Sequence, residues 1–286
     1  MRKVGVVADS ICCLPQEIVK KYDIHVVPME IIYEGKSYRD GIDISPNEVY
    51  KIMRKKEHLP TTSTASVGDF LNAYRQLSQK AQSVLCITVT SLQSKVFEAA
   101  SAAKEIAKEE IPGAIIEVFD SRSVAAALGF IVREAARVAS EGAELAEVVE
   151  AARNMMGRVN FLATLDTLYY LARLGRIARA AAWAGNVLDV KPVLEHNPAI
   201  GETMPVARPR TRRKAIEKML QIMSDRTKGS PVHVMVQHAD DLEEAKKLAA
   251  EIESRFNCVE MYITEFAPVM GVHTGPGLLA IGFYAD

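Results

Sequence analysis

The chain has 286 residues, of which 49% are hydrophobic, 25% are charged and 6% are aromatic, and its formal net charge at pH 7 is −1. This composition is that of a folded globular protein, and it excludes a disordered or fibrous chain. The near-neutral charge and the few aromatic residues argue against a nucleic-acid surface, so we expect no nucleic-acid partner. A chain of this length favours two domains.

The amino-terminal segment and the cysteines indicate a soluble cytoplasmic protein. The opening MRKVGVVADS lacks the apolar stretch and cleavage site of a signal peptide. No segment approaches the roughly 18 uninterrupted apolar residues of a membrane span, so any membrane contact would be transient. The cysteines Cys12, Cys13, Cys86 and Cys258 have no zinc-site spacing and fit a reducing compartment. We expect neither a metal ion nor a cofactor.

The first half of the chain alternates apolar β-rich runs with amphipathic or alanine-rich helical stretches. Strands are predicted at 3–8, 24–32, 83–89 and 114–119, and helices at 67–77, 96–107, 122–140 and 143–156. This alternation predicts a parallel sheet with helices on its faces. We therefore assign residues 1–157 to a parallel α/β domain.

The pattern changes after about residue 157. A hairpin is predicted around the turn 197–201, and the remaining strands and helices are expected at 212–223, 232–237, 241–256, 259–264 and 278–284. Hairpins mixed with helices favour a mixed or antiparallel α+β domain at 158–286. We expect it to pack closely on the first domain, with the ligand site in the cleft between them.

Three polar segments are candidates for a binding site. Hydroxyl groups crowd 61–64, just before a helix that is predicted to start near Ser66, and 88–94 join a strand to a helix. A helix N-terminus favours an anion, and hydroxyls beside it add donors. The third segment, 271–277, places His273 in a glycine-rich loop whose backbone could approach a ligand closely.

The same residues also have structural interpretations. Serine and threonine before a helix usually act as caps, and a lone histidine is more often structural than catalytic. Asp9-Ser10 and Asp120-Ser121 follow predicted strands, so they could line the cleft or form ordinary turns. No nucleotide-binding, zinc-protease or nucleophile-elbow motif is present. From the residues alone, an anion-binding cleft and a purely structural role both stay open.

Eight segments, in order along nearly the whole chain, resemble the DegV family. They are VADSICCLP at 7–15, DGIDIS at 40–45, PTTSTAS at 60–66, TSLQSKVFEAA at 90–100, FDS at 119–121, YYLARLGRI at 169–177, VKPVLEHNPAIGETMPVARPRTRRKA at 190–215 and GVHTGPGLLAIGFY at 271–284. The resemblance implies a two-domain α/β fold that binds a long-chain fatty acid. It also implies that the protein presents the acid to a separate ATP-dependent fatty acid kinase, which forms an acyl phosphate.

The resemblance further implies which residues hold the fatty-acid carboxylate. They are Thr62 and Ser63, the Gln93-Ser94 region, and His273 with its neighbour Thr274. The family's LSGT segment is Leu-Gln-Ser-Lys here, so Gln93 stands at the usual serine position and Ser94 at the glycine position. Arg173 and Arg176 match basic positions that would serve kinase docking.

Two further expectations concern the acyl tail and an alternative function. The apolar segments 122–136 and 162–188, including Trp183, are candidates for lining a tunnel, although they would also serve as ordinary core. The alternative is an enzyme that acts on a small anionic or ester substrate, either phosphotransferase-like or a serine hydrolase with His273 as base. It requires a hydroxyl within reach of His273 and a third group that orients the imidazole.

Overall fold

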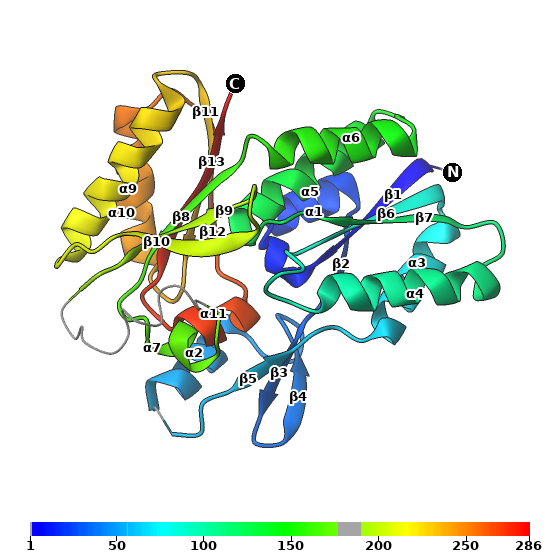
Figure 1. Cartoon of the computed structure of the whole chain (residues 1–286), viewed down its shortest axis with the longest axis horizontal. Helices are drawn as coiled ribbons and strands as arrows, with labels where there is room; N and C mark the ends of the chain where they lie inside the picture. Colours follow the sequence, from blue (N-terminus) through cyan, green and yellow to red (C-terminus); the bar gives the residue numbers. More distant parts are fainter. Residues whose placement is uncertain (1, 56, 177–189) are drawn as a thin grey trace. The chain divides into compact units, whose positions relative to one another are not determined.

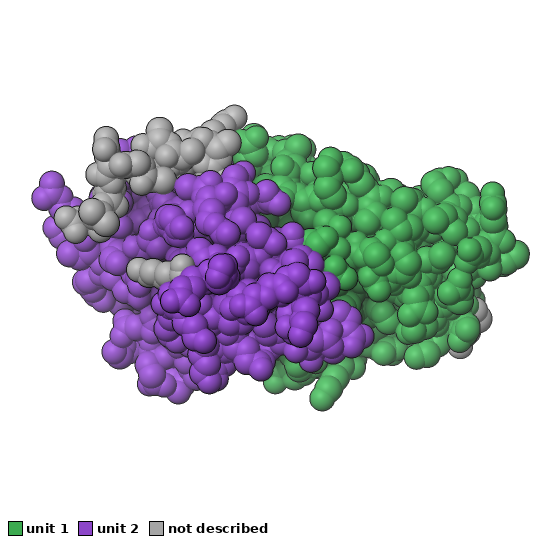
Figure 2. Space-filling view, turned by 90° about the horizontal axis from the view of Figure 1, so that it is seen from below, with its two compact units in different colours: residues 1–30, 63–157, 198–202 green, residues 31–62, 158–197, 203–286 purple. Residues whose placement is uncertain are grey.

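The computed structural model describes residues 2–55, 57–176 and 190–286, which form two compact units (Figures 1 and 2). Unit 1 comprises 1–30, 63–157 and 198–202, and unit 2 comprises 31–62, 158–197 and 203–286. The predicted boundary after residue 157 coincides with one of these limits. Residues 31–62 come from the first half of the chain but belong to unit 2, and residues 198–202 come from the second half but belong to unit 1. As a description of folding domains, the division into 1–157 and 158–286 stays a prediction.

A four-stranded parallel sheet in the order β2-β1-β6-β7 forms the centre of unit 1. Its strands are β1 (Arg2–Asp9), β2 (His25–Val27), β6 (Ala81–Thr88) and β7 (Ile115–Asp120). The predicted parallel sheet is confirmed. Because the chain adds β2 on one side of β1 and β6 on the other, the direction of strand addition reverses between β1 and β6. The carboxyl ends of strands at such a reversal are where open α/β sheets bind ligands.

Helices cover both faces of this sheet, with α5 and α6 on one face and α3 and α4 on the other (Figure 1). The helices of unit 1 are α1 (Gln16–Tyr22), α3 (Val67–Ser78), α4 (Val96–Glu110), α5 (Ala125–Ser140) and α6 (Leu145–Met156). Helix α3 starts where the sequence predicts, because Ser66 caps it. The Ser66 Oγ accepts a hydrogen bond from the Asp69 amide at 3.1 Å, and the Asp69 carboxylate accepts one from the Ser66 amide at 2.9 Å.

Unit 2 contains a six-stranded mixed sheet in the order β10-β9-β8-β13-β11-β12, as expected for the second half of the chain. Its strands are β8 (Asn160–Thr164), β9 (Val193–Asn197), β10 (Glu202–Ala207), β11 (Val232–His238), β12 (Cys258–Glu265) and β13 (Leu279–Ala285). Strand β13 pairs antiparallel with β8 and β11, whereas β11 pairs parallel with β12. Alternate strand residues such as Val234, Ile281 and Leu162 are fully buried in one hydrophobic core.

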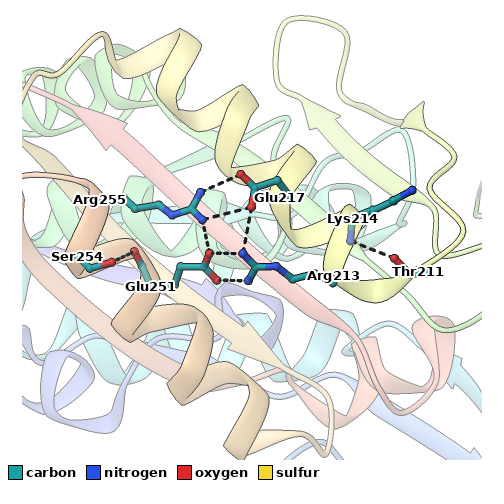
Figure 3. A network of polar contacts seen from close by, with 7 residues as sticks. All are labelled: Thr211, Arg213, Lys214, Glu217, Glu251, Ser254 and Arg255. Atoms are coloured by element: carbon teal, nitrogen blue, oxygen red, sulfur yellow. Dashed lines mark hydrogen bonds and ion pairs between the residues drawn. The ribbon is translucent and has the colours of Figure 1, made fainter.

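Helices α9 (Arg212–Thr227) and α10 (Leu242–Arg255) supply the helical side of that core. Their outer surfaces are joined by a network of ion pairs (Figure 3). The Arg213 guanidinium donates to Glu251 at 2.9 Å, and the Arg255 guanidinium donates to Glu217 at 3.0 Å. Much of the basic run at 208–214 therefore has a structural role, since Arg212 also pairs with Asp241.

A small three-stranded sheet in unit 2 differs from the sequence-based prediction. The run at 24–32 was expected to be one strand, but Pro28, which has no amide to donate, separates β2 from β3 (Glu30–Tyr33). Strand β3 pairs with β4 (Lys36–Arg39) and β5 (Thr61–Ser63). The first hydroxyl cluster is therefore a strand that precedes the capped helix, rather than the helix entrance itself.

Candidate functional site

The site is built around α11 (Pro268–Thr274), a short helix in unit 2 that packs against α2 (Pro46–Lys55) and α7 (Tyr169–Arg173). Pro268 at the first helical position needs no hydrogen-bond acceptor for its nitrogen. The next amide, that of Val269, donates at 3.0 Å to the carboxylate of Asp40, which is buried. Asp40 therefore fixes the start of the helix that carries His273.

The glycines of this segment make room for the protein's own side chains. The segment 271–277 was expected to be a loop, but residues up to Thr274 lie in α11. A Cβ atom on Gly271 would stand 2.5 Å from the hydroxyl of Tyr50, on Gly275 it would clash with the Tyr170 ring, and on Gly277 with the Asp166 carboxylate. These glycines therefore have a packing role, and the interpretation that they let the backbone approach a ligand stays a prediction.

Thr62 and His273 lie in contact. Strand β5 presents the half-buried Thr62, and the Oγ1 atom of this threonine is 2.9 Å from Nε2 of His273. Both residues belong to unit 2. The structure therefore brings together the two residues that the sequence most strongly predicts as carboxylate ligands, although 211 positions separate them.

The imidazole of His273 is neutral at physiological pH. Burial, aided by the positive charge of Arg176, lowers the pKa of His273 to about 4. The Nδ1 atom is buried and has no hydrogen-bond partner among the described residues. A neutral imidazole and a threonine hydroxyl carry one hydrogen each, and their mutual bond uses only one of them. In either tautomer the pair thus keeps one spare donor, on Nδ1 or on the Thr62 hydroxyl, for an incoming acceptor.

The neighbours Ser63 and Thr274 are placed differently from this pair. Ser63 is the exposed last residue of β5. The hydroxyl of Thr274 is buried and faces main-chain carbonyls, with Met270 O at 3.3 Å and Gly275 O at 3.4 Å. Because that hydroxyl can donate only one hydrogen, it is engaged within α11, and a ligand contact by Thr274 stays a prediction.

The segment that replaces the family's LSGT motif follows β6 in unit 1. Gln93 and Ser94 are both half-buried. Gln93 is the last residue of a turn at 91–93, and Ser94 follows it shortly before the start of α4. The amide of Gln93 donates to Thr90 O at 3.3 Å. Lys95 pairs with Glu98 at 2.6 Å, and its side chain is 75% exposed, so it faces solvent. The proposed ligand contacts of Gln93 and Ser94 stay predictions.

Arg173 and Arg176 are exposed at the end of α7. The guanidinium of Arg176 donates to Leu174 O at 2.8 Å, so it caps the end of this helix. Arg176 also acts on His273 through its charge, which motif comparison did not suggest. Its predicted docking role and that of Arg173 stay predictions.

The geometry meets one of the two requirements of the hydrolase alternative. A hydroxyl, that of Thr62, lies within reach of the imidazole of His273. A third group that would orient the ring through Nδ1 is not found among the residues described here. Within the same residues, no cluster of three or more His, Cys, Asp or Glu side chains could hold a metal ion, and no helix is long and apolar enough to span a membrane.

Sequence reasoning did not identify Asp40 and Tyr50 as supports of the site. Asp40 lies in the DGIDIS segment, and Tyr50 lies one turn into the next helix. Their role depends on a contact with α11 more than 200 residues away, which no local pattern signals. Trp183, expected to line an acyl tunnel, lies outside the described residues.

Comparisons with known proteins agree with this architecture. The family model of the DegV family, described as an uncharacterised protein family, matches residues 3–286. A DegV domain-containing protein of Clostridium acetobutylicum is 33% identical over 284 residues, covering 99% of this chain and 98% of that protein. A DegV family protein from Thermus thermophilus, whose structure is described as showing fatty acid binding, superposes with a TM-score of 0.91 at 28% identity over 100% of both chains. A stearic acid-binding protein from Eubacterium ventriosum superposes with a TM-score of 0.90 at 28% identity, over 100% of this chain and 98% of that one.

Proposed function

The chain belongs to the DegV family, and we propose that it is a fatty-acid-binding protein that buries a long acyl tail and holds the carboxylate through Thr62 and His273. The observation that carries this proposal is the 2.9 Å contact between these two residues, together with the Nδ1 atom of His273, for which the described residues offer no hydrogen-bond partner. The fatty-acid-binding proteins from Thermus thermophilus and Eubacterium ventriosum, which share the fold, support the choice of ligand.

The neutral state of His273 suits it to a carboxylate in a poorly hydrated site. The spare hydrogen of the Thr62–His273 pair would be donated to one carboxylate oxygen, which offsets part of the cost of removing that oxygen from water. The carboxylate would in turn favour the protonated imidazole, since opposite charges stabilise each other. Gln93 and Ser94 are proposed as additional contacts on the similarity of their segment alone.

The acyl tail supplies most of the binding free energy. Each buried methylene contributes about 0.8 kcal/mol, so a tail of ~14 methylenes would contribute roughly 11 kcal/mol before the costs of association. The carboxylate contacts then determine orientation and selectivity for an acid over an alcohol or ester. A head-group variant should therefore weaken binding without abolishing it.

Lipid extraction followed by mass spectrometry tests the proposal directly. Full-length protein purified under native conditions should carry a long-chain fatty acid, and delipidated protein should take up stearic acid. His273→Ala should weaken uptake, whereas His58→Ala, a substitution of an exposed histidine, should leave it unchanged. Repeated delipidated preparations that take up neither stearic nor palmitic acid would overturn the proposal.

We further propose that the protein presents its fatty acid to a separate ATP-dependent kinase, with Arg173 and Arg176 at the docking surface. Both are exposed cationic side chains, suited to an acidic partner surface. Arg173 is the better test, because Arg176 also influences His273. Arg173→Glu should abolish acyl phosphate formation by a fatty acid kinase at unchanged affinity for stearic acid. Unchanged acyl phosphate formation would exclude Arg173 from docking.

Hydrolysis is the second candidate function, because Thr62 lies within hydrogen-bond reach of His273. If the pair is catalytic, the wild type should hydrolyse a p-nitrophenyl acyl ester faster than both His273→Ala and Thr62→Val. We expect equal rates for the three proteins, since the described residues supply no third group to orient the imidazole.

A further inference from the structure

Two aspartates at the carboxyl edge of the unit 1 sheet hold the loop that follows β6. Asp9 ends β1, Asp120 ends β7, and β6 lies between these strands. Each aspartate accepts a bond from the amide two residues ahead of it, that of Ile11 at 3.0 Å and that of Arg122 at 2.9 Å. These local bonds are the ordinary turn chemistry of aspartate.

Each aspartate also accepts hydrogen bonds from the loop after β6. One oxygen of the fully buried Asp9 accepts the amide of Val89 at 2.7 Å. From the opposite side, Asp120 accepts the Ser91 amide at 3.2 Å and the Ser91 hydroxyl at 2.6 Å. The loop is thus held from both neighbouring strands by charge-assisted hydrogen bonds, which are the stronger kind.

The start of α4, on the other side of the same loop, contributes less to holding the loop in place. Lys95, at the N-cap of α4, makes no side-chain capping bond within the described part of the chain, and its ammonium pairs with Glu98. Helices that begin at a serine or aspartate fix the preceding residues through the cap, as Ser66 does for α3. The residues at the end of the turn, just before α4, therefore lack a side-chain cap on the helix side, which makes the bonds on the strand side more important for their position.

Gln93 and Ser94 are those residues. The amide of Gln93 bonds to the carbonyl of Thr90, and the amide of Thr90 bonds to the carbonyl of Ser123 at 3.0 Å. Ser91 and Gln93 lie in the same turn, two residues apart, so a displacement of Ser91 would shift the backbone of Gln93 as well. We propose that Asp9 and Asp120 are positioning residues that clamp the loop after β6, so that Gln93 and Ser94 are held in place to contact the fatty-acid carboxylate.

This inference rests on the proposed function, and a double-mutant cycle separates the two. The probe is stearic acid, and the protein is the full-length, delipidated chain. Asp120→Asn removes the negative charge and replaces the oxygen that accepts the Ser91 hydroxyl by an amide group, while the other oxygen can still accept the Ser91 and Arg122 amides. It should weaken binding about tenfold. In a Gln93→Ala/Ser94→Ala background the same change should cost less than about twofold, because the side chains it positions are absent.

Three further variants exclude a general loss of stability. Ser91→Ala removes only the hydroxyl donor and should weaken binding about threefold, and Ser91→Thr, which keeps the hydroxyl, should restore it. Glu117→Gln makes the same carboxylate-to-amide change on β7, where the side chain pairs with Lys104 at 3.0 Å, and should bind like the wild type. If Asp120→Asn does not fold, the two Ser91 variants carry the test.

The outcomes are distinct. Failure of the wild type to take up stearic acid would overturn the proposed function and this inference together. Uptake by the wild type, with equal losses from Asp120→Asn in both backgrounds, would overturn only the clamp. Wild-type affinity in the Gln93→Ala/Ser94→Ala protein would do the same, because there would then be no contact to position.

Discussion

The hydroxyl of Thr62 and the imidazole of His273 form a 2.9 Å hydrogen bond between an edge of the small three-stranded sheet and the last turn of α11. The α11 side of this contact is supported at two places. Asp40 holds the amide end of α11, and the Tyr50 ring fills the space left by Gly271. His273 therefore lies on a helix that is held by contacts with residues far away in the chain, which is the arrangement expected of a preorganised site.

Replacing either member of the pair should weaken fatty-acid binding by a similar amount. Thr62→Val keeps the shape of the side chain but removes the hydroxyl, and the expected loss is about 1.5 kcal/mol, roughly tenfold in Kd. The double variant with His273→Ala should lose much less than the sum of the two single losses, since each needs the other. Isothermal titration calorimetry measures the four proteins. Thr61→Val, a change at an exposed neighbour on β5, is the control.

His273 should make the protein less stable in acid. Its pKa in the folded protein is about 4, below the ordinary value of 6.5, so the unfolded chain binds the proton more tightly. This contribution to stability is complete above pH 6.5 and is lost as the pH falls towards 4, with a slope of at most about 1.4 kcal/mol per pH unit. Urea unfolding of wild type and His273→Gln between pH 8 and pH 4 measures it. Burial also lowers the pKa values of His25 and His238, so only the difference between the two proteins reports His273. A difference that grows in favour of the wild type towards pH 4 would contradict the prediction.

Gly275→Ala should destabilise unit 2 strongly. Gly275 has a φ of +78°, and an added Cβ would meet the Tyr170 ring. Gly229→Ala is the matched control, because its φ is +82° but no described atom lies within 4 Å of the added Cβ. The control should cost about 1 kcal/mol from backbone strain alone, and Gly275→Ala about 2–4 kcal/mol. Equal losses in urea unfolding would mean that the Tyr170 ring moves away freely.

The ion pairs between α9 and α10 should contribute little and should weaken with salt. Glu251 accepts bonds from both Arg213 and Arg255, but the arginine side chains are 64% and 38% exposed. Glu251→Gln should cost less than about 1 kcal/mol, and the cost should shrink in 1 M sodium chloride. Glu243→Gln, whose carboxylate pairs with Lys246 on the same helix, is the control. A larger loss that salt does not reduce would indicate a network shielded from solvent.

Local patterns in the sequence suffice for much of the fold. The strand β6 follows from a local apolar run, and the start of α3 follows from the Ser66 cap. Both depend on residues that are neighbours in the sequence, so both can be predicted from it. The break at Pro28 could also be predicted, because proline has no backbone N–H to donate to a neighbouring strand. It was overlooked because the apolar run continues on both sides of the proline.

The candidate site could be predicted only in part. Family motifs identify Thr62 and His273, and the structure joins them. The supports of the site are not local: Asp40 and Val269 are 229 positions apart, and the bond between Asp9 and Val89 spans 80. The packing role of the glycines could not be predicted for the same reason, since the Tyr50 and Tyr170 rings that occupy the space beside them lie far away in the chain.

The assignment of residues 31–62 to unit 2 has a consequence for how the protein is made. The ribosome synthesises the chain from its amino end. Asp40, Tyr50 and Thr62 therefore emerge long before α11, the helix that they contact. Until α11 follows, the bond between Asp40 and Val269 cannot form, and a fragment that ends before α11 cannot assemble the Thr62–His273 pair. A nascent chain should therefore gain the Thr62–His273 pair only after α11 has been synthesised.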